Sequence, residues 1–195
     1  MRLIFATNNQ NKIAEIKTAL TDGLEIITLK EAGIDIEIEE PFNTLEENAR
    51  EKATVILNLT HQNCFSEDTG LEVAALNGAP GVKSARYAGN EANNKKNIAL
   101  LLKNMEAKKE RSAQFKTVIC LLLNNKEYLF TGICEGKINS EERGSLGFGY
   151  DAVFIPDGTE NTFAEMNMEE KNKYSHRKKA LVQLITFLNN YNGQS

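Results

Sequence analysis

Residues 7–12, with the sequence TNNQNK, join a short apolar run to the start of an expected helix. A strand that ends in a polar loop and opens a helix presents free backbone N–H groups and the positive end of the helix dipole, which both favour phosphate. Lys12 would add a full positive charge, and Thr7 and Asn8 would add side-chain donors. The segment lacks the GxxxxGK[ST] pattern of a P-loop, so the alternative is an ordinary helix start capped by asparagine.

Three acidic residues, Glu40, Glu67 and Asp68, form a second candidate group. Glu67 and Asp68 follow a short expected strand over residues 64–66. Carboxylates gathered at a strand end suit Mg²⁺, which prefers oxygen ligands and keeps several waters. A further carboxylate can act as a base on such a water. The alternative is a solvated acidic turn.

The run from residue 171 to residue 179, KNKYSHRKK, is basic in a chain whose net charge is −4. We expect it just before and in the first turn of a helix, where positive charge opposes the helix dipole. An anionic ligand would explain this placement, and a solvated basic turn is the alternative. His176 and His61 are the only histidines of the sequence, which argues against a histidine metal site.

The stretch from residue 147 to residue 151, GFGYD, combines glycine with aromatic residues. Glycine allows close approach of the backbone to a ligand, and an aromatic ring offers a stacking face for a base. The alternative is a β-bulge or a turn with aromatic side chains in the core.

Strands and helices must alternate to position these groups. We expect strands at residues 2–6, 24–29, 35–39, 64–66, 114–123 and 127–134, the last two as a hairpin. We expect helices after the 7–11 loop, after the capping box of Thr44 and Glu47, at 93–105 and at about 177–191. The first of these helices would place Ile13, Ile16 and Leu20 on one face. The mixture indicates an α/β or α+β fold with a mixed sheet.

Length and composition limit the class of protein. The length of 195 residues favours one domain over residues 1–195 and allows two lobes within it. With 23 basic and 27 acidic residues, a non-specific nucleic-acid partner is not expected, whereas a small anionic substrate is compatible. The apolar N-terminal run is too short for a signal peptide or a membrane span, so we expect no membrane partner and a cytoplasmic setting. Three cysteines without a CxxC pattern argue against thiolate zinc.

Taken together, six segments resemble the inosine triphosphate pyrophosphatase family, in the family's order and over nearly the whole chain. They are ATNNQNK (6–12), ENAREKA (47–53), SEDTGLEVAALNGAPGVKSARYAG (66–89), GFGYDAVFIP (147–156), FAEM (163–166) and EKNKYSHRKKAL (170–181). The resemblance implies an elongated α/β fold, with a mixed sheet, flanking helices and two lobes around a central nucleotide cleft. It also implies a homodimer that hydrolyses ITP, dITP and XTP with Mg²⁺, giving the monophosphate and pyrophosphate and clearing these nucleotides from the pool.

The resemblance implies a role for each matching residue. Asp68 matches the proton acceptor, supported by Glu67, and Glu40 and Asp68 match the Mg²⁺ ligands. The residues implied to bind the triphosphate are Thr7, Asn8, Asn9, Gln10, Asn11, Lys12 and Lys52, and Thr69 matches a substrate-contacting hydroxyl. The residues implied to recognise the base are Phe148, Gly149, Tyr150, Asp151, Lys171, His176 and Arg177.

The chemistry of the residues agrees with this reading. A nucleoside triphosphate carries about four negative charges, which Lys12, Lys52, Lys171 and one Mg²⁺ would neutralise. Donors from His176 and Arg177 would suit the 6-oxo group of hypoxanthine or xanthine and would be left unpaired by adenine. Two rival functions stay open: a related house-cleaning pyrophosphatase with another base preference, and a non-catalytic nucleotide- or RNA-binding module.

Overall fold

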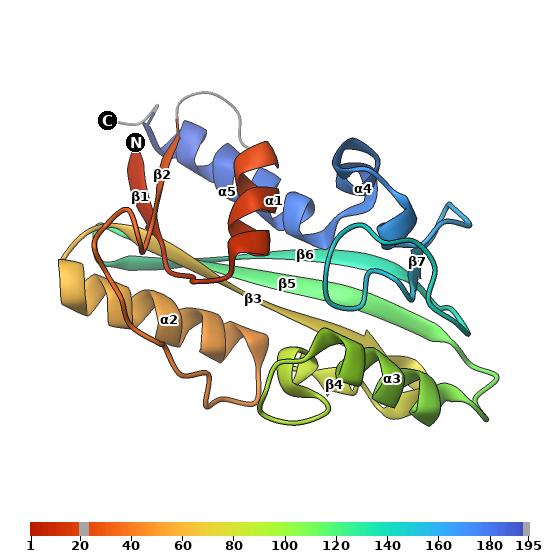
Figure 1. Cartoon of the computed structure of the whole chain (residues 1–195). Helices are drawn as coiled ribbons and strands as arrows, with labels where there is room; N and C mark the ends of the chain where they lie inside the picture. Colours follow the sequence, from red (N-terminus) through yellow and green to blue (C-terminus); the bar gives the residue numbers. More distant parts are fainter. Residues whose placement is uncertain (20–23, 193–195) are drawn as a thin grey trace. The chain divides into compact units, whose positions relative to one another are not determined.

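A mixed β-sheet runs through the computed structural model, which describes residues 1–19 and 24–192 (Figure 1). The strand order is β2-β1-β3-β5-β6-β7, and β4 pairs with β3. Strands β2 and β3 both pair with β1 in parallel. Strand β4 pairs with β3, and β7 pairs with β6, in antiparallel orientation. The strands are β1 (Arg2–Phe5), β2 (Glu25–Thr28), β3 (Cys64–Val73), β4 (Pro80–Gly81), β5 (Ser112–Leu123), β6 (Lys126–Ile138) and β7 (Phe154–Pro156).

Of the α-helices in the described residues, three lie in connections between strands, and two follow the last strand. The α-helices are α1 (Gln10–Ala19), α2 (Leu45–Thr60), α3 (Asn94–Met105), α4 (Met168–Tyr174) and α5 (His176–Asn192). Short 3₁₀ turns are η1 (Ala74–Leu76), η2 (Ser84–Arg86) and η3 (Phe163–Glu165). This arrangement confirms the α/β class and the mixed sheet. In the described part of the chain, no helix has the length and apolar character that crossing a membrane requires.

The chain divides into two compact units. Of the described residues, the first contains 1–19, 24–68, 117–132 and 177–192, and the second contains 69–116 and 133–176. Each has its own hydrophobic core, built around Phe5, Phe65 and Leu184 in the first unit and around Leu71, Phe115 and Phe163 in the second. A single domain whose two lobes enclose a nucleotide cleft stays a prediction.

The local sequence explains most of the element boundaries. The Thr44 side chain accepts from the N–H of Glu47 and caps α2, as expected. Asn124 and Asn125 both have positive φ, of 51° and 61°, which is the conformation of a two-residue hairpin turn between β5 and β6. The structure confirms four predicted strands and two predicted helices within a few residues. The strands are those at 2–6, 24–29, 114–123 and 127–134, and the helices are those at 93–105 and 177–191.

Two expectations about the elements were wrong, and one lies outside the described residues. Residues 35–39 form no strand. Their isoleucines are half-buried in alternation, and the segment's backbone accepts a side-chain hydrogen bond from Asn8 at the Ile36 carbonyl, at 2.8 Å. The strand that begins at Cys64 does not end at Ser66 but continues to Val73. Leu20 falls in the range that the structure does not describe.

Candidate active site

The alternation of strand β3 sends its two acidic side chains to opposite faces of the sheet. Cys64 and Ser66 bond to backbone carbonyls of α2, so their side chains face that helix. Phe65 points the other way, into the core that α1 and α5 cover. With a side-chain period of two, Glu67 follows Phe65 toward α1 and α5, and Asp68 follows Ser66 toward α2. Both acids are buried, at 1% and 6% exposure, so the solvated acidic turn is excluded.

The end of strand β1 brings the 7–12 segment to these acids. The register of β1 on β3 ends at Phe5 opposite Phe65, and the N–H of Ala6 donates to the Phe65 carbonyl at 2.8 Å. The chain then turns into α1, whose first N–H groups are capped by the Asn9 side chain. Lys12, in the first turn of α1, lies with its Nζ 3.3 Å from Oε1 of Glu67. The asparagine cap is therefore real, and the expected phosphate segment lies beside the acidic pair.

Glu67 is held as an anion in an ion-pair cluster. The Nε of Arg177 donates to both carboxylate oxygens of Glu67, at 3.0 and 2.8 Å, and its Nη1 pairs with Glu15. Burial alone would raise the pKa of Glu67, but the charges of Arg177 and Lys12 hold that pKa below its ordinary value. Glu15 was not among the predicted residues. It lies one helical turn after Lys12, and that spacing on one face of α1 is the signal that would have found it.

Asp68 has a different environment. Lys52 is only 7% exposed on α2, and its Nζ lies 3.3 Å from Oδ1 of Asp68 and also contacts the carboxylate of Glu40. Burial raises the pKa of Asp68 above its ordinary value, against the opposing charges of Lys52 and Lys12. Burial also acts to lower the pKa of Lys52, but Asp68 and Glu40 outweigh it and raise that pKa. Of the two adjacent acids, Asp68 is thus the more basic.

The donors around Lys52 fit a magnesium ion. Glu40 and Asp68 converge on one ammonium group, which marks a place between two carboxylates where a cation is stabilised. Among the residues described, no group of three or more His, Cys, Asp or Glu side chains forms a complete metal site. Mg²⁺ does not need one, because it commonly binds through one or two carboxylates together with substrate phosphates and water.

The GFGYD stretch forms a second cluster, within the second unit. Nζ of Lys171 lies 2.6 Å from Oδ2 of Asp151, and both side chains are buried. The same Oδ2 accepts from the Phe148 N–H at 2.9 Å. Gly147 has φ of +75°, and a Cβ there would collide with the Asp151 carboxyl group, so glycine is required at that position. The Tyr150 hydroxyl donates to the Ser84 carbonyl at 2.8 Å, and Phe148 and Gly149 are half-buried.

The basic run does not sit before one helix but spans the end of α4 and the start of α5. Lys173 and Lys179 are exposed, as a solvated turn would have them, whereas Lys171, His176 and Arg177 are each 3% exposed. Helix α4 was missed. Its signal is the capping box of Asn167 and Glu170, in which each side chain accepts from the other residue's N–H.

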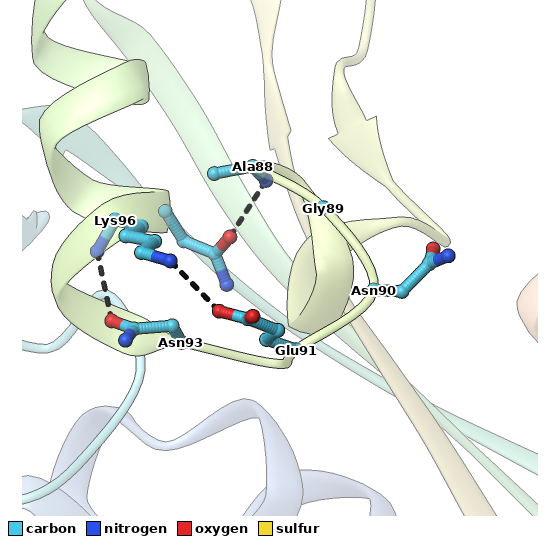
Figure 2. A pocket seen from close by; sticks show the side chains of 7 residues that line it. Ala88, Gly89, Asn90, Glu91, Asn93 and Lys96 are labelled. Atoms are coloured by element: carbon cyan, nitrogen blue, oxygen red, sulfur yellow. Dashed lines mark hydrogen bonds and ion pairs between the residues drawn. The ribbon is translucent and has the colours of Figure 1, made fainter.

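A pocket in the second unit does not coincide with either cluster. It has a volume of about 370 Å³ and lies between the loop after η2 and the start of α3 (Figure 2). Asn97 accepts from the Ala88 N–H at 2.8 Å, the Asn93 side chain caps the N–H of Lys96, and Lys96 pairs with Glu91 at 2.7 Å. None of the predicted site residues lines this pocket.

Comparison with known proteins identifies relatives over nearly the full length. The model of the Ham1 family matches residues 3–187. The dITP/XTP pyrophosphatase of Flavobacterium psychrophilum is 49% identical, over 97% of this chain and 100% of its own. A HAM1 protein from Coxiella burnetii superposes with a TM-score of 0.89 and 38% identity, over 97% and 99% of the two chains. The Staphylococcus aureus Ham1 protein gives a TM-score of 0.88 and 35% identity, over 98% and 100%.

Proposed function

The chain belongs to the Ham1 family, and on this basis we propose that it hydrolyses the noncanonical purine nucleotides ITP, dITP and XTP to the monophosphate and pyrophosphate. Such a reaction would clear these nucleotides from the pool. The observation that carries the proposal is the buried pair Glu67 and Asp68 on β3, which contact Lys12 of α1 and Lys52 of α2 respectively. A protein that only binds anions would gain nothing from burying two acids at that place.

The triphosphate is bound by the residues around the start of α1. The backbone of Thr7, Asn8, Asn9, Gln10 and Asn11 leads into the helix, whose first turn carries no acidic residue. Lys12 and Lys52 supply full charges, and the helix dipole adds a partial one. Phosphate oxygens would compete with Glu67 and Asp68 for these two ammonium groups.

Hydrolysis requires a base beside the α-phosphorus. Asp68 has the raised pKa that suits a proton acceptor, whereas Glu67 is fixed by Arg177 and keeps its negative charge. A water molecule attacks the α-phosphorus, Asp68 takes its proton, and the bond to the bridging oxygen breaks so that pyrophosphate leaves. Mg²⁺ held by Glu40 and Asp68 would supply charge neutralisation of the phosphates and a more acidic water.

Buried hydrogen-bond donors would distinguish the purine base of the substrate. Lys171 and His176, with Arg177, provide N–H groups suited to a 6-oxo group, and Phe148 offers a ring face. An adenine amino group would leave such donors unpaired, which costs far more than a missing apolar contact. Thr69, Gly149, Tyr150 and Asp151 complete the proposed substrate contacts.

The proposed setting is a homodimer in the cytoplasm. All three cysteines, Cys64, Cys120 and Cys134, are buried free thiols, which agrees with a reducing compartment. Burial raises the pKa of Cys64 and of Cys120 to about 12, so neither thiol is reactive at neutral pH. The homodimer rests on the family resemblance, and sedimentation of the purified protein tests it.

A substrate profile tests the function against its rivals. Pyrophosphate release is measured for ITP, dITP, XTP, dTTP, dUTP, GTP and ATP, with Mg²⁺ and with EDTA. We expect the first three to be hydrolysed far faster than the others, with slow but measurable release from ATP, and release only with Mg²⁺. Preference for dTTP or dUTP would favour the related house-cleaning enzyme, and binding of ITP without its consumption would favour the binding module.

A further inference from the structure

Three aromatic rings form one buried cluster in the second unit. They are Phe115 on β5, Phe154 on β7 and Phe163 on η3. The ring centroids of Phe115 and Phe154 are 4.7 Å apart, and those of Phe154 and Phe163 are 5.3 Å apart. The ring of Phe115 is 7% exposed and the other two are fully buried. The capping box of Thr162 and Glu165 fixes the backbone of η3, which carries Phe163.

The imidazole of His176 lies flat on this cluster. Its centroid is 4.6 Å from that of Phe115, and the two ring planes differ by only 13°. Phe163 approaches the same imidazole at 6.4 Å with a tilt of 40°. A near-parallel stack allows the imidazole to rotate within its plane but resists tilting out of it. Phe115 therefore defines the plane in which the two ring nitrogens of His176 lie.

The ammonium of Lys171 is placed by the same cluster. It lies 5.2 Å from the centroid of Phe163 and 5.4 Å from that of Phe148, with Asp151 as its ion-pair partner at 2.6 Å. A cation over ring faces is stabilised more strongly when it is desolvated, and Lys171 is 3% exposed. Phe163 thus contacts both Lys171 and His176.

We propose that Phe115 and Phe163 are positioning residues that determine base selectivity by fixing the His176 ring plane and the Lys171 ammonium. The inference rests on the proposed function, in which these two groups recognise the base. Discrimination through hydrogen bonds requires donors held within a fraction of an ångström of their place. Lys12 and Lys52, in contrast, are held by ion pairs with Glu67 and with Asp68. Loss of a flat ring should therefore change selectivity and leave phosphate chemistry unaltered.

The first test is Phe115→Leu, which keeps a branched apolar side chain and removes the flat face. We expect kcat/KM for ITP to fall about tenfold while that for ATP stays nearly unchanged, as for a misplaced donor. The ratio of kcat/KM for ITP to kcat/KM for ATP, called the ITP to ATP ratio below, therefore falls about tenfold as well. Phe163→Leu is measured in parallel, and because this ring contacts Lys171 as well as His176, we expect a fall at least as large.

Phe130→Leu is the matched control. Phe130 is 9% exposed in the core of the first unit, where its centroid lies 5.5 Å from that of Phe187. The substitution removes the same atoms from a buried ring that packs against the partly buried Phe187, so it should lower the melting temperature comparably. Its ITP to ATP ratio should equal that of the wild type. A reduced ratio in this control would mean that loss of core packing alone alters selectivity, and would overturn the proposal.

A second readout does not depend on activity. The chain has two histidines, so its proton NMR spectrum contains two pairs of imidazole C–H signals, which a His61→Gln variant assigns. The stack on Phe115 should shift the His176 signals upfield, and Phe115→Leu should abolish that shift. Loss of the shift with an ITP to ATP ratio within twofold of the wild type would overturn the positioning role. Failure of the wild type to release pyrophosphate from ITP would instead overturn the proposed function, whatever the NMR result.

Discussion

Nζ of Lys52 lies 3.3 Å from Oδ1 of Asp68 and simultaneously contacts the carboxylate of Glu40. One buried ammonium group on α2 thus compensates two carboxylates from separate segments of the chain. Such a charge is costly to bury unless it is paired, and breaking the pair leaves a carboxylate uncompensated. In the proposed reaction, Lys52 serves the phosphates while the two carboxylates hold the metal.

Replacing Lys52 should weaken every substrate alike. Lys52→Ala is expected to reduce kcat/KM for ITP and for XTP by a similar factor, roughly 10- to 100-fold for loss of a charge-assisted hydrogen bond. Lys12→Ala should behave in the same way, because phosphate contacts carry no information about the base. Lys173→Ala is the control, since Lys173 is exposed. A large change in the ratio of kcat/KM for ITP to kcat/KM for XTP would instead mean that these lysines contact the purine base.

Asp68→Asn removes the proposed proton acceptor and a metal ligand together. The fold and much of the nucleotide affinity should remain, while kcat should fall by on the order of 10³ or more. Circular dichroism and nucleotide binding establish that the variant is intact, and steady-state kinetics with Mg²⁺ give kcat. Asp157→Asn, at an exposed position, is the control. Turnover near that of the wild type would show that Asp68 is not the base.

Glu67 should contribute stability that depends on pH. Its pKa is lowered in the folded protein, mainly by Arg177 once burial is overcome. A lowered carboxyl pKa stabilises the native state above the ordinary glutamate value, about 4.3, and that contribution is lost as pH falls through the lowered pKa. Glu67→Gln is expected to lower the free energy of unfolding at pH 7 by about 3 kcal/mol, with Arg177 retaining Glu15.

Denaturant unfolding in EDTA measures this contribution at a series of pH values between neutral and acid. The difference between the wild type and Glu67→Gln should be largest at neutral pH and should shrink on acidification. A difference that does not change with pH would mean that the charge of Glu67 is not what stabilises the fold.

The sequence predicted which residues meet at the centre of the candidate site, because its motifs lie next to regular elements. A polar segment after strand β1 and an acidic pair on β3 come together as soon as the two strands pair in parallel. The predicted strand at residues 35–39 was wrong because alternating isoleucines also occur in an extended segment that pairs with no neighbouring strand. Which members of the basic run are buried could not be predicted from the sequence. Charge alone does not distinguish Arg177, paired with two acids, from exposed Lys179.

His176 offers a direct test of base recognition. His176→Ala should bring kcat/KM for ITP closer to that for ATP. The change should come from a lower kcat/KM for ITP, with phosphate binding intact. An unpaired polar partner costs ~1–3 kcal/mol, which corresponds to roughly one to two decades in the ratio. If the basic run only neutralised phosphate, both nucleotides would be hydrolysed more slowly by the same factor. An unchanged ratio would exclude a base-reading role for His176.

Product analysis in labelled water shows directly which phosphorus the water attacks. ITP is hydrolysed with Mg²⁺ in water enriched in heavy oxygen, and the products are identified by mass spectrometry. Attack at the α-phosphorus predicts IMP and pyrophosphate in equal amounts, with the heavy oxygen in IMP alone. Formation of IDP and inorganic phosphate, or heavy oxygen in pyrophosphate, would mean that water attacks a phosphorus other than the α-phosphorus.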